Sequence, residues 1–155
     1  FGIIQGLETA PLRMKQHCSN AQKVVDYLTK NKNVEKVIYP NLHTGEIGDR
    51  AKRYFNGGNG GLVGIEVKGG VEAGKKFIES LKMFYHVANI GDARSLAIHP
   101  GTTTHSQLNE KELLLAGVTP GYIRLSIGIE HPDDIIADLD QALEASGKTN
   151  LKAVS

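Results

Sequence analysis

The sequence has almost no net charge and few aromatic side chains. Its 18 Lys and Arg residues nearly balance its 17 Asp and Glu residues, for a formal net charge of +1, and aromatic residues make up 6% of the chain. The basic residues are interspersed with acids, so the sequence lacks the clustered cations and stacking rings of a nucleic-acid-binding surface. We therefore expect no nucleic-acid partner.

Cysteine is almost absent too, since Cys18 is the only one in the chain. A single cysteine cannot form an intramolecular disulfide, which is typical of proteins in a reducing compartment, and we expect a cytoplasmic protein. Cys18 falls on the apolar face of a predicted helix. Because free cysteines are usually buried, we expect it to pack in the core rather than to act as a nucleophile.

Long apolar runs are also missing. No stretch approaches membrane-spanning length, and no charged segment precedes an apolar one at the start, so we expect neither a membrane anchor nor a secretion signal. The chain opens with the apolar sequence Phe-Gly-Ile-Ile-Gln-Gly and has no initiator Met. A fragment and a processed N-terminus would explain this start equally well.

The 155 residues are enough for one domain with a real core, and 40% of them are hydrophobic. The first helix is predicted to run to about Lys30, with a kink or a break near Pro11. Its apolar stripe, at helical spacing, comprises Met14, Cys18, Ala21, Val25 and Leu28.

The rest of the chain alternates between predicted strands and helices. Strands are expected at 34–39, 62–67, 83–90 and 122–130, with a short apolar piece at 96–98, and helices at 49–55, 71–81, 109–116 and 132–146. This pattern predicts an α/β (α+β) two-layer sandwich, in which helices cover one face of a mostly antiparallel or mixed sheet of about five strands. We expect one domain over 1–146 and, after Gly147 ends the last helix, a flexible tail over 147–155.

The strand at 122–130 carries the strongest chemical signal. Its alternation sends Ile123, Leu125, Ile127 and Ile129 to one face and Arg124, Ser126, Gly128 and Glu130 to the other. A guanidinium on a rigid strand presents a planar fork that matches a carboxylate or a phosphate. The alternative is a surface arginine paired with a neighbouring acid.

Two other features suggest sites but fit them poorly. The Asn- and Gly-rich run at 56–61 leads into a strand rather than opening a helix, so it predicts a flexible turn and not a phosphate loop. His86, His99 and His105 could suggest zinc, but no cysteine or clustered acid completes a tetrahedral site. Structural or interface histidines are the better interpretation. A Ser-His-Asp triad also lacks its strand-turn-helix elbow.

Four stretches carry a resemblance to a known family. They are Gln-Gly-Leu-Glu-Thr-Ala-Pro-Leu-Arg-Met (5–14), Ala-Asn-Ile-Gly-Asp-Ala-Arg-Ser-Leu-Ala-Ile-His-Pro (88–100), Thr-Thr-His-Ser-Gln (103–107) and Ile-Arg-Leu-Ser-Ile-Gly-Ile-Glu (123–130). In this order they resemble the C-terminal small domain of the fold-type I, pyridoxal-phosphate (PLP) enzymes of Cys/Met metabolism, and most of all the O-acetylhomoserine sulfhydrylase branch. The resemblance extends from about Gln5 to Ser146.

The resemblance implies roles for five residues. Arg124 would hold the α-carboxylate of the amino-acid substrate, and Asn89 would offer its backbone to the same group. Ser95, Thr104 and His105 match family positions near the cleft; we expect Ser95 to bind the substrate and Thr104 and His105 to line the cleft. The Schiff-base lysine and the other cofactor-binding residues of the family belong to a larger N-terminal domain, and none of their motifs occurs here. The resemblance therefore implies no catalytic residue and no bound PLP in this chain alone.

The implied whole enzyme is a cytoplasmic tetramer whose N-terminal PLP domain leads into this chain through the long helix within 1–30. It would replace the acetate of O-acetyl-L-homoserine by sulfide or by a small thiol. With sulfide it would make L-homocysteine for methionine biosynthesis. Methionine γ-lyase and cystathionine γ-synthase are alternatives, which Asn89 disfavours. From a different class, the chain could be a stand-alone binding or assembly module without chemistry of its own.

Overall fold

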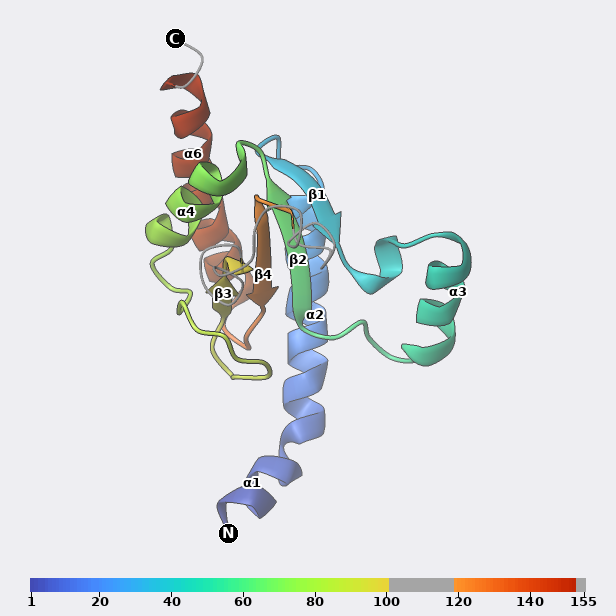
Figure 1. Cartoon of the computed structure of the whole chain (residues 1–155). Helices are drawn as coiled ribbons and strands as arrows, with labels where there is room; N and C mark the ends of the chain where they lie inside the picture. The colour runs from blue at the N-terminus through green and yellow to red at the C-terminus, as the bar shows by residue number, and fades with distance from the viewer. Residues whose placement is uncertain (101–118, 153–155) are drawn as a thin grey trace.

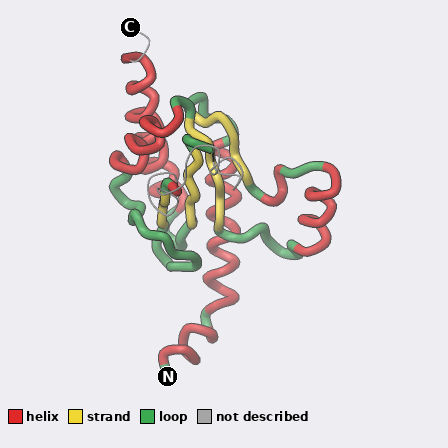
Figure 2. Tube along the Cα trace, in the orientation of Figure 1, coloured by secondary structure: helices red, strands yellow, loops and turns green. Residues whose placement is uncertain are grey.

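The computed structural model describes residues 1–100 and 119–152, with side chains described up to residue 147. Figures 1 and 2 show helices and strands alternating along the chain around one sheet. The strands are β1 (Val34–Ile38), β2 (Leu62–Val67), β3 (Leu96–Ile98) and β4 (Tyr122–Ser126). The helices are α1 (Gly2–Glu8), α2 (Ala10–Leu28), α3 (Gly45–Tyr54), α4 (Gly70–Ser80) and α6 (Pro132–Lys152), with a 3-10 turn η1 at Pro40–Leu42.

The four described strands form an antiparallel sheet in the order β1-β2-β4-β3. In its register, Gly64 of β2 and Ile98 of β3 lie on either side of Arg124 in β4. Arg124 therefore sits on a strand that is paired on both sides, where its backbone has little freedom to move.

Helices α2, α4 and α6 cover one face of this sheet (Figure 1). Alternate residues of β2 and β4 point towards them, and the resulting core is fully buried in its centre. The core includes Val63, Ile65, Ile123 and Leu125 from the sheet, with Leu28, Phe77 and Leu139 from the three helices. The predicted two-layer α/β sandwich, with helices on one face of the sheet, is confirmed.

The predicted break in the first helix is also confirmed, because α1 ends at Glu8 and α2 begins at Ala10. The predicted stripe is only partly buried. Its C-terminal residues Ala21, Val25 and Leu28 lie in the core, whereas Met14 remains 48% exposed. Cys18 is half-buried, at the edge of the core.

The predicted strand at 83–90 is wrong. Within it only Tyr85 forms a β-bridge, to Leu96. The reason lies in α6, where the carboxylate of Asp138 accepts the backbone N–H groups of Lys82, Met83 and Phe84 at 2.9 to 3.3 Å. A side chain distant in sequence thus takes the donors that a neighbouring strand would need.

Three helix and strand ends also differ from the predictions. Strand β4 ends at Ser126, and α3 begins at Gly45 instead of residue 49. Helix α6 continues through Gly147 to Lys152, so residues 148–152 are helical and not a tail. A Cβ on Gly147 would lie 2.9 Å from Oδ1 of Asn33, so the glycine here makes room for a neighbour and does not end the helix. The predicted helix at 109–116 lies outside the described residues.

Asp138 offers a test of this arrangement. The variant Asp138→Ala leaves the three N–H groups of 82–84 without their acceptor, so the free energy of unfolding should fall by about 2 to 3 kcal/mol. Urea unfolding would measure the loss. The exposed Glu79 on α4 is the control, because Glu79→Ala should change stability by less than about 0.5 kcal/mol. Equal midpoints for both variants would contradict the assigned role of Asp138.

Candidate functional site

Arg124 lies half-buried on the face of the sheet opposite helices α2, α4 and α6. Its Nη2 donates to the backbone carbonyl of Asn89 at 3.2 Å. Its Nε is buried and has no hydrogen-bond partner among the described residues. No acid of residues 1–100 or 119–147 forms an ion pair with it. Within the described residues, Arg124 is therefore not a surface arginine paired with a neighbouring acid, which was the alternative interpretation of the sequence.

Among the described residues, the side chains around Arg124 on the sheet add no negative charge that pairs with it. Gly64 faces it across the β2–β4 pair, and a Cβ there would lie 2.9 Å from the ring of Tyr122, so the glycine makes room for that ring. Burial raises the pKa of Tyr122 and the charge of Arg124 works in the opposite direction. Tyr122 therefore keeps its proton near neutral pH and supplies no negative charge.

The segment that starts at Asn89 forms the second half of the site. Asn89 Oδ1 accepts the N–H of Ile90 at 2.9 Å, and Gly91 follows with a φ of +78° that favours glycine. Asp92 then accepts the N–H of Arg94 at 3.0 Å, and this bond and the guanidinium of Arg94 lower the pKa of Asp92. The structure thus brings the Asn89 carbonyl next to Arg124, while the role of Asn89 in substrate binding, which the family resemblance implies, stays a prediction.

Ser95 is fully buried, and its hydroxyl is already engaged. The hydroxyl donates to Glu130 Oε2 at 2.9 Å and accepts the N–H of Gly128 at 2.9 Å. The structure therefore places Ser95 in a polar cluster with Glu130, to which the sequence had assigned no role. Thr104 and His105, the other two predicted cleft residues, lie outside the described residues.

His99 is a structural histidine. It is buried, its Nε2 donates to the carbonyl of Pro120 at 2.8 Å, and burial lowers its pKa, so the ring is neutral near pH 7. The ring also lies against Gly74 of α4, where a Cβ would approach Nε2 to 2.8 Å. No group of three or more His, Cys, Asp or Glu residues in the described part of the chain could hold a metal ion.

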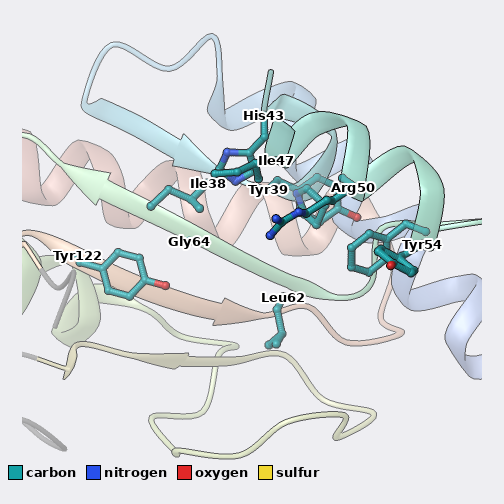
Figure 3. A pocket seen from close by; sticks show the side chains of 12 residues that line it. Ile38, Tyr39, His43, Ile47, Arg50, Tyr54, Leu62, Gly64 and Tyr122 are labelled. Atoms are coloured by element: carbon teal, nitrogen blue, oxygen red, sulfur yellow. The ribbon is translucent and has the colours of Figure 1, made fainter. Parts of the chain in front are cut away.

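A cavity of about 380 Å³ opens between α3 and the sheet (Figure 3). Tyr122, which lines it, lies two residues before Arg124 in β4, so the two side chains share one face of the sheet. Tyr122, Gly64 and Leu62 line it from the sheet, and Arg50 and Tyr54 from α3. Local sequence patterns do not predict this cavity, because its walls come from segments far apart in the chain. Buried Tyr39 forms another part of the lining.

The described residues do not suit PLP itself. A lysine that forms a Schiff base has to be desolvated to become a nucleophile, but every lysine whose side chain is described is exposed. Arg124 and the backbone beside it at Asn89, with the neutral Tyr122 on the same strand, can bind and orient an anion such as a carboxylate.

The chain is similar to a family of known enzymes and to individual members of it. Residues 1–144 match the family described as Cys/Met metabolism PLP-dependent enzymes. The chain is 54% identical over 143 residues to an O-acetyl-L-homoserine sulfhydrylase of Leptospira meyeri, covering 92% of the chain and 32% of that protein. It is 44% identical to an L-methionine gamma-lyase of Fusobacterium nucleatum subsp. nucleatum, covering 93% of the chain and 36% of that protein.

A solved structure shares the fold. It is a Campylobacter jejuni protein described as an O-acetylhomoserine (thiol)-lyase that contains N′-pyridoxyl-lysine-5′-monophosphate, with 44% identity and a TM-score of 0.83. The match covers 90% of this chain and 33% of that one. The chain therefore spans about a third of the length of these relatives. Among residues 1–100 and 119–152, no helix combines the length and the apolar character needed to cross a membrane.

Tyr39, in the cavity wall, makes the stability of the folded chain depend on pH. Its hydroxyl donates to the carbonyl of Gly60 at 2.8 Å, and burial raises its pKa from 10.0 to about 12. Above pH 10 the unfolded chain loses this proton while the folded chain keeps it. The stabilising contribution is therefore complete below pH 10 and is lost as the pH rises towards about 12.

Tyr39→Phe removes this titration. The stability advantage of the wild type over the variant should shrink by about 1 kcal/mol between about pH 9 and about pH 11, measured by urea unfolding. Tyr54→Phe is the control for the loss of a tyrosine hydroxyl from the same cavity wall, because Tyr54 is 71% exposed and its substitution should change the free energy of unfolding by less than about 0.5 kcal/mol. A stability difference for Tyr39→Phe that stays constant from about pH 9 to about pH 11 would show that the hydroxyl is not buried as described.

Proposed function

The chain belongs to the Cys/Met metabolism PLP-dependent enzymes, and on that premise we propose that it is the C-terminal, carboxylate-binding domain of an O-acetyl-L-homoserine sulfhydrylase. The complete enzyme would replace the acetate of O-acetyl-L-homoserine by sulfide and release L-homocysteine. The 54% identity to the Leptospira meyeri sulfhydrylase supports this branch of the family.

The uncompensated charge of Arg124 is the observation that carries the proposal. A half-buried guanidinium has lost part of its hydration, and in the described part of the chain no acid replaces it. The α-carboxylate of an amino acid would supply the missing charge and could accept two parallel N–H bonds from the planar fork. Substrate binding would then satisfy a group that the folded domain leaves open.

Arg124 and Asn89 would serve to bind and orient, not to transfer protons. By fixing the carboxylate, they would leave the amino group and the side chain of the substrate directed at the reacting centre, which lowers the entropy cost of the reaction. PLP, when bound in the complete enzyme, supplies the electron sink for the bond changes. Since the described residues do not suit PLP, we assign its binding to an N-terminal domain outside this chain.

Two further expectations belong to the complete enzyme. We propose that it is a cytoplasmic protein, because a chain with a single cysteine suits a reducing compartment. We also propose that it is a homo-tetramer, as the family resemblance implies. Ser95, Thr104 and His105 remain candidates for residues near the substrate.

Methionine γ-lyase is the second candidate, since a lyase of that name is 44% identical over nearly the same span. Both activities begin with the same carboxylate contact, so Arg124 does not distinguish them. Asn89 favours the sulfhydrylase, because the lyase and cystathionine synthase branches of the family often have Ser at this position.

Assays of the complete enzyme separate the candidates. We expect O-acetyl-L-homoserine and sulfide to yield homocysteine with a kcat/KM well above that for the breakdown of L-methionine. Cysteine in place of sulfide tests for cystathionine synthesis in the same experiment. A higher kcat/KM for methionine breakdown would replace the sulfhydrylase with the lyase.

The role of Arg124 has its own test. Arg124→Ala should lower kcat/KM for O-acetyl-L-homoserine roughly 10- to 100-fold through a higher KM, because a charge-assisted hydrogen bond to the substrate is lost. The KM for sulfide, which carries no carboxylate, should not change. Arg124→Lys should recover only part of the loss, since an ammonium cannot form the planar fork.

The control for this test is Arg53→Ala. Arg53 is exposed on α3, with its guanidinium 5.4 Å from the centroid of the Tyr54 ring, and its loss should leave the kinetics unaltered. If Arg124→Ala gave an unchanged KM and an unchanged turnover number, Arg124 would have no place in the site.

A further inference from the structure

Every polar group of Ser95 is used to close one loop. Its carbonyl accepts the N–H of Tyr85 at 3.0 Å, where the loop begins. Its own N–H donates to Glu130 Oε1 at 2.6 Å, and its hydroxyl donates to Glu130 Oε2 at 2.9 Å. Both carboxylate oxygens of Glu130 are therefore occupied by one residue. Within the described residues no cation forms an ion pair with Glu130.

The backbone that carries Glu130 is itself held from α2. The Nδ1 of buried His17 donates to the carbonyl of Ile127 at 2.6 Å. The side-chain amide of buried Asn20 donates to the carbonyls of Gly128 and Glu130 at 3.0 and 2.8 Å. The segment after β4 thus has fixed partners although it has left the sheet, and Glu130 is a rigid anchor point.

The loop passes directly over this anchor. A Cβ on Gly128 would lie 2.5 Å from the carbonyl oxygen of Ala93 and 2.6 Å from the carbonyl carbon of Arg94, so only glycine fits beneath it. The N–H of Ile129 donates to the carbonyl of Ala93 at 2.8 Å. These contacts hold the C-terminal end of the loop against the end of β4.

The opposite end of the same loop forms part of the proposed substrate site. Its residues from Tyr85 to Gly91 are exposed, and the carbonyl of Asn89 reaches Nη2 of Arg124. Ser95 is thus one of the residues that fix where Asn89 lies, together with Ala93, which is bound to Ile129, and Tyr85, which is bound to Ala97. If Ser95 were released from Glu130, the C-terminal end of the loop would lose two of its hydrogen bonds.

We infer that Ser95 and Glu130 are positioning residues for the carboxylate site: they hold the Asn89 loop beside Arg124 without touching the substrate. The inference rests on the proposed function, because it assumes that Arg124 and Asn89 bind the substrate carboxylate. It gives Ser95 a role that its buried and fully bonded hydroxyl can fulfil, and it adds Glu130 to the residues that determine substrate affinity.

The test measures how strongly the complete, cofactor-loaded enzyme prefers a carboxylate. L-norvaline and L-norvalinamide share the amino group and the side chain, but only norvaline has a carboxylate. Titrating each compound while following the visible absorbance of the cofactor gives two dissociation constants. The constant for norvalinamide divided by the constant for norvaline measures the preference for a carboxylate. Ser95→Ala and Glu130→Gln should each reduce this ratio roughly tenfold, since small displacements in a binding site weaken it strongly.

A purely structural role would not change that ratio. If both variants had lower melting temperatures or fewer active molecules but kept the wild-type ratio, the inference would be wrong. Glu79→Gln, on the exposed side of α4, is the matched control and should leave the ratio unchanged. The KM for sulfide should stay at the wild-type value in both Ser95→Ala and Glu130→Gln.

Arg124→Ala separates this inference from the proposed function. If that variant keeps the wild-type ratio, the proposed function itself fails. If Arg124→Ala lowers the ratio while Ser95→Ala and Glu130→Gln keep the wild-type value, only the positioning role fails. If neither Ser95→Ala nor Glu130→Gln folds, amide hydrogen exchange of the unmodified enzyme tests the positioning role instead. The Ser95 amide should exchange more slowly with norvaline than with norvalinamide, and equal rates would overturn the inference.

Discussion

An arginine on a doubly paired strand, with no acid beside it in the described part of the chain, is the constraint around which the domain is arranged. Three helices bury one face of the sheet, and the other face carries Arg124 with Gly64 and Tyr122 beside it. The acid on this face, Glu66, pairs with Lys36 at 4.0 Å and not with Arg124. Removing a charge from water without a partner is unfavourable. A protein that keeps such a group gains from any ligand that brings the opposite charge, and a substrate carboxylate does so.

Residues 127–130, which follow β4, keep a fixed position beside the site although they no longer belong to the sheet. Side chains of α2 and of the Asn89 loop take over the hydrogen bonds that a longer strand would make, through His17, Asn20 and Ser95. All three are buried polar residues, and loss of any one would leave a buried partner unsatisfied. Such an arrangement is costly to disturb, which suits a surface that has to bind a ligand in one orientation.

Much of this could be predicted from the sequence, because it depends on local patterns. The alternation in β2 and β4 predicts their buried faces, Pro11 indicates the break between α1 and α2, and the same alternation places Arg124 on the polar face. The family motifs add Asn89 as its neighbour, and the structure brings the two together.

What could not be predicted depends on contacts between distant segments. Asp138 accepts the N–H groups of 82–84 from across the fold, so an apolar stretch that reads as a strand is not one. Gly147 lies inside α6, where it leaves room for the side chain of Asn33 and does not end the helix. In the same way, nothing in the local sequence joins Glu130 to Ser95, although the alternation had placed Glu130 on the polar face.

The most direct test of the central claim is a crystal structure of the complete enzyme with a bound amino acid such as L-norvaline. The account predicts that the α-carboxylate lies within hydrogen-bonding distance of the Arg124 guanidinium, beside the backbone of Asn89. A carboxylate bound elsewhere, with Arg124 paired to an acid of the protein, would contradict it.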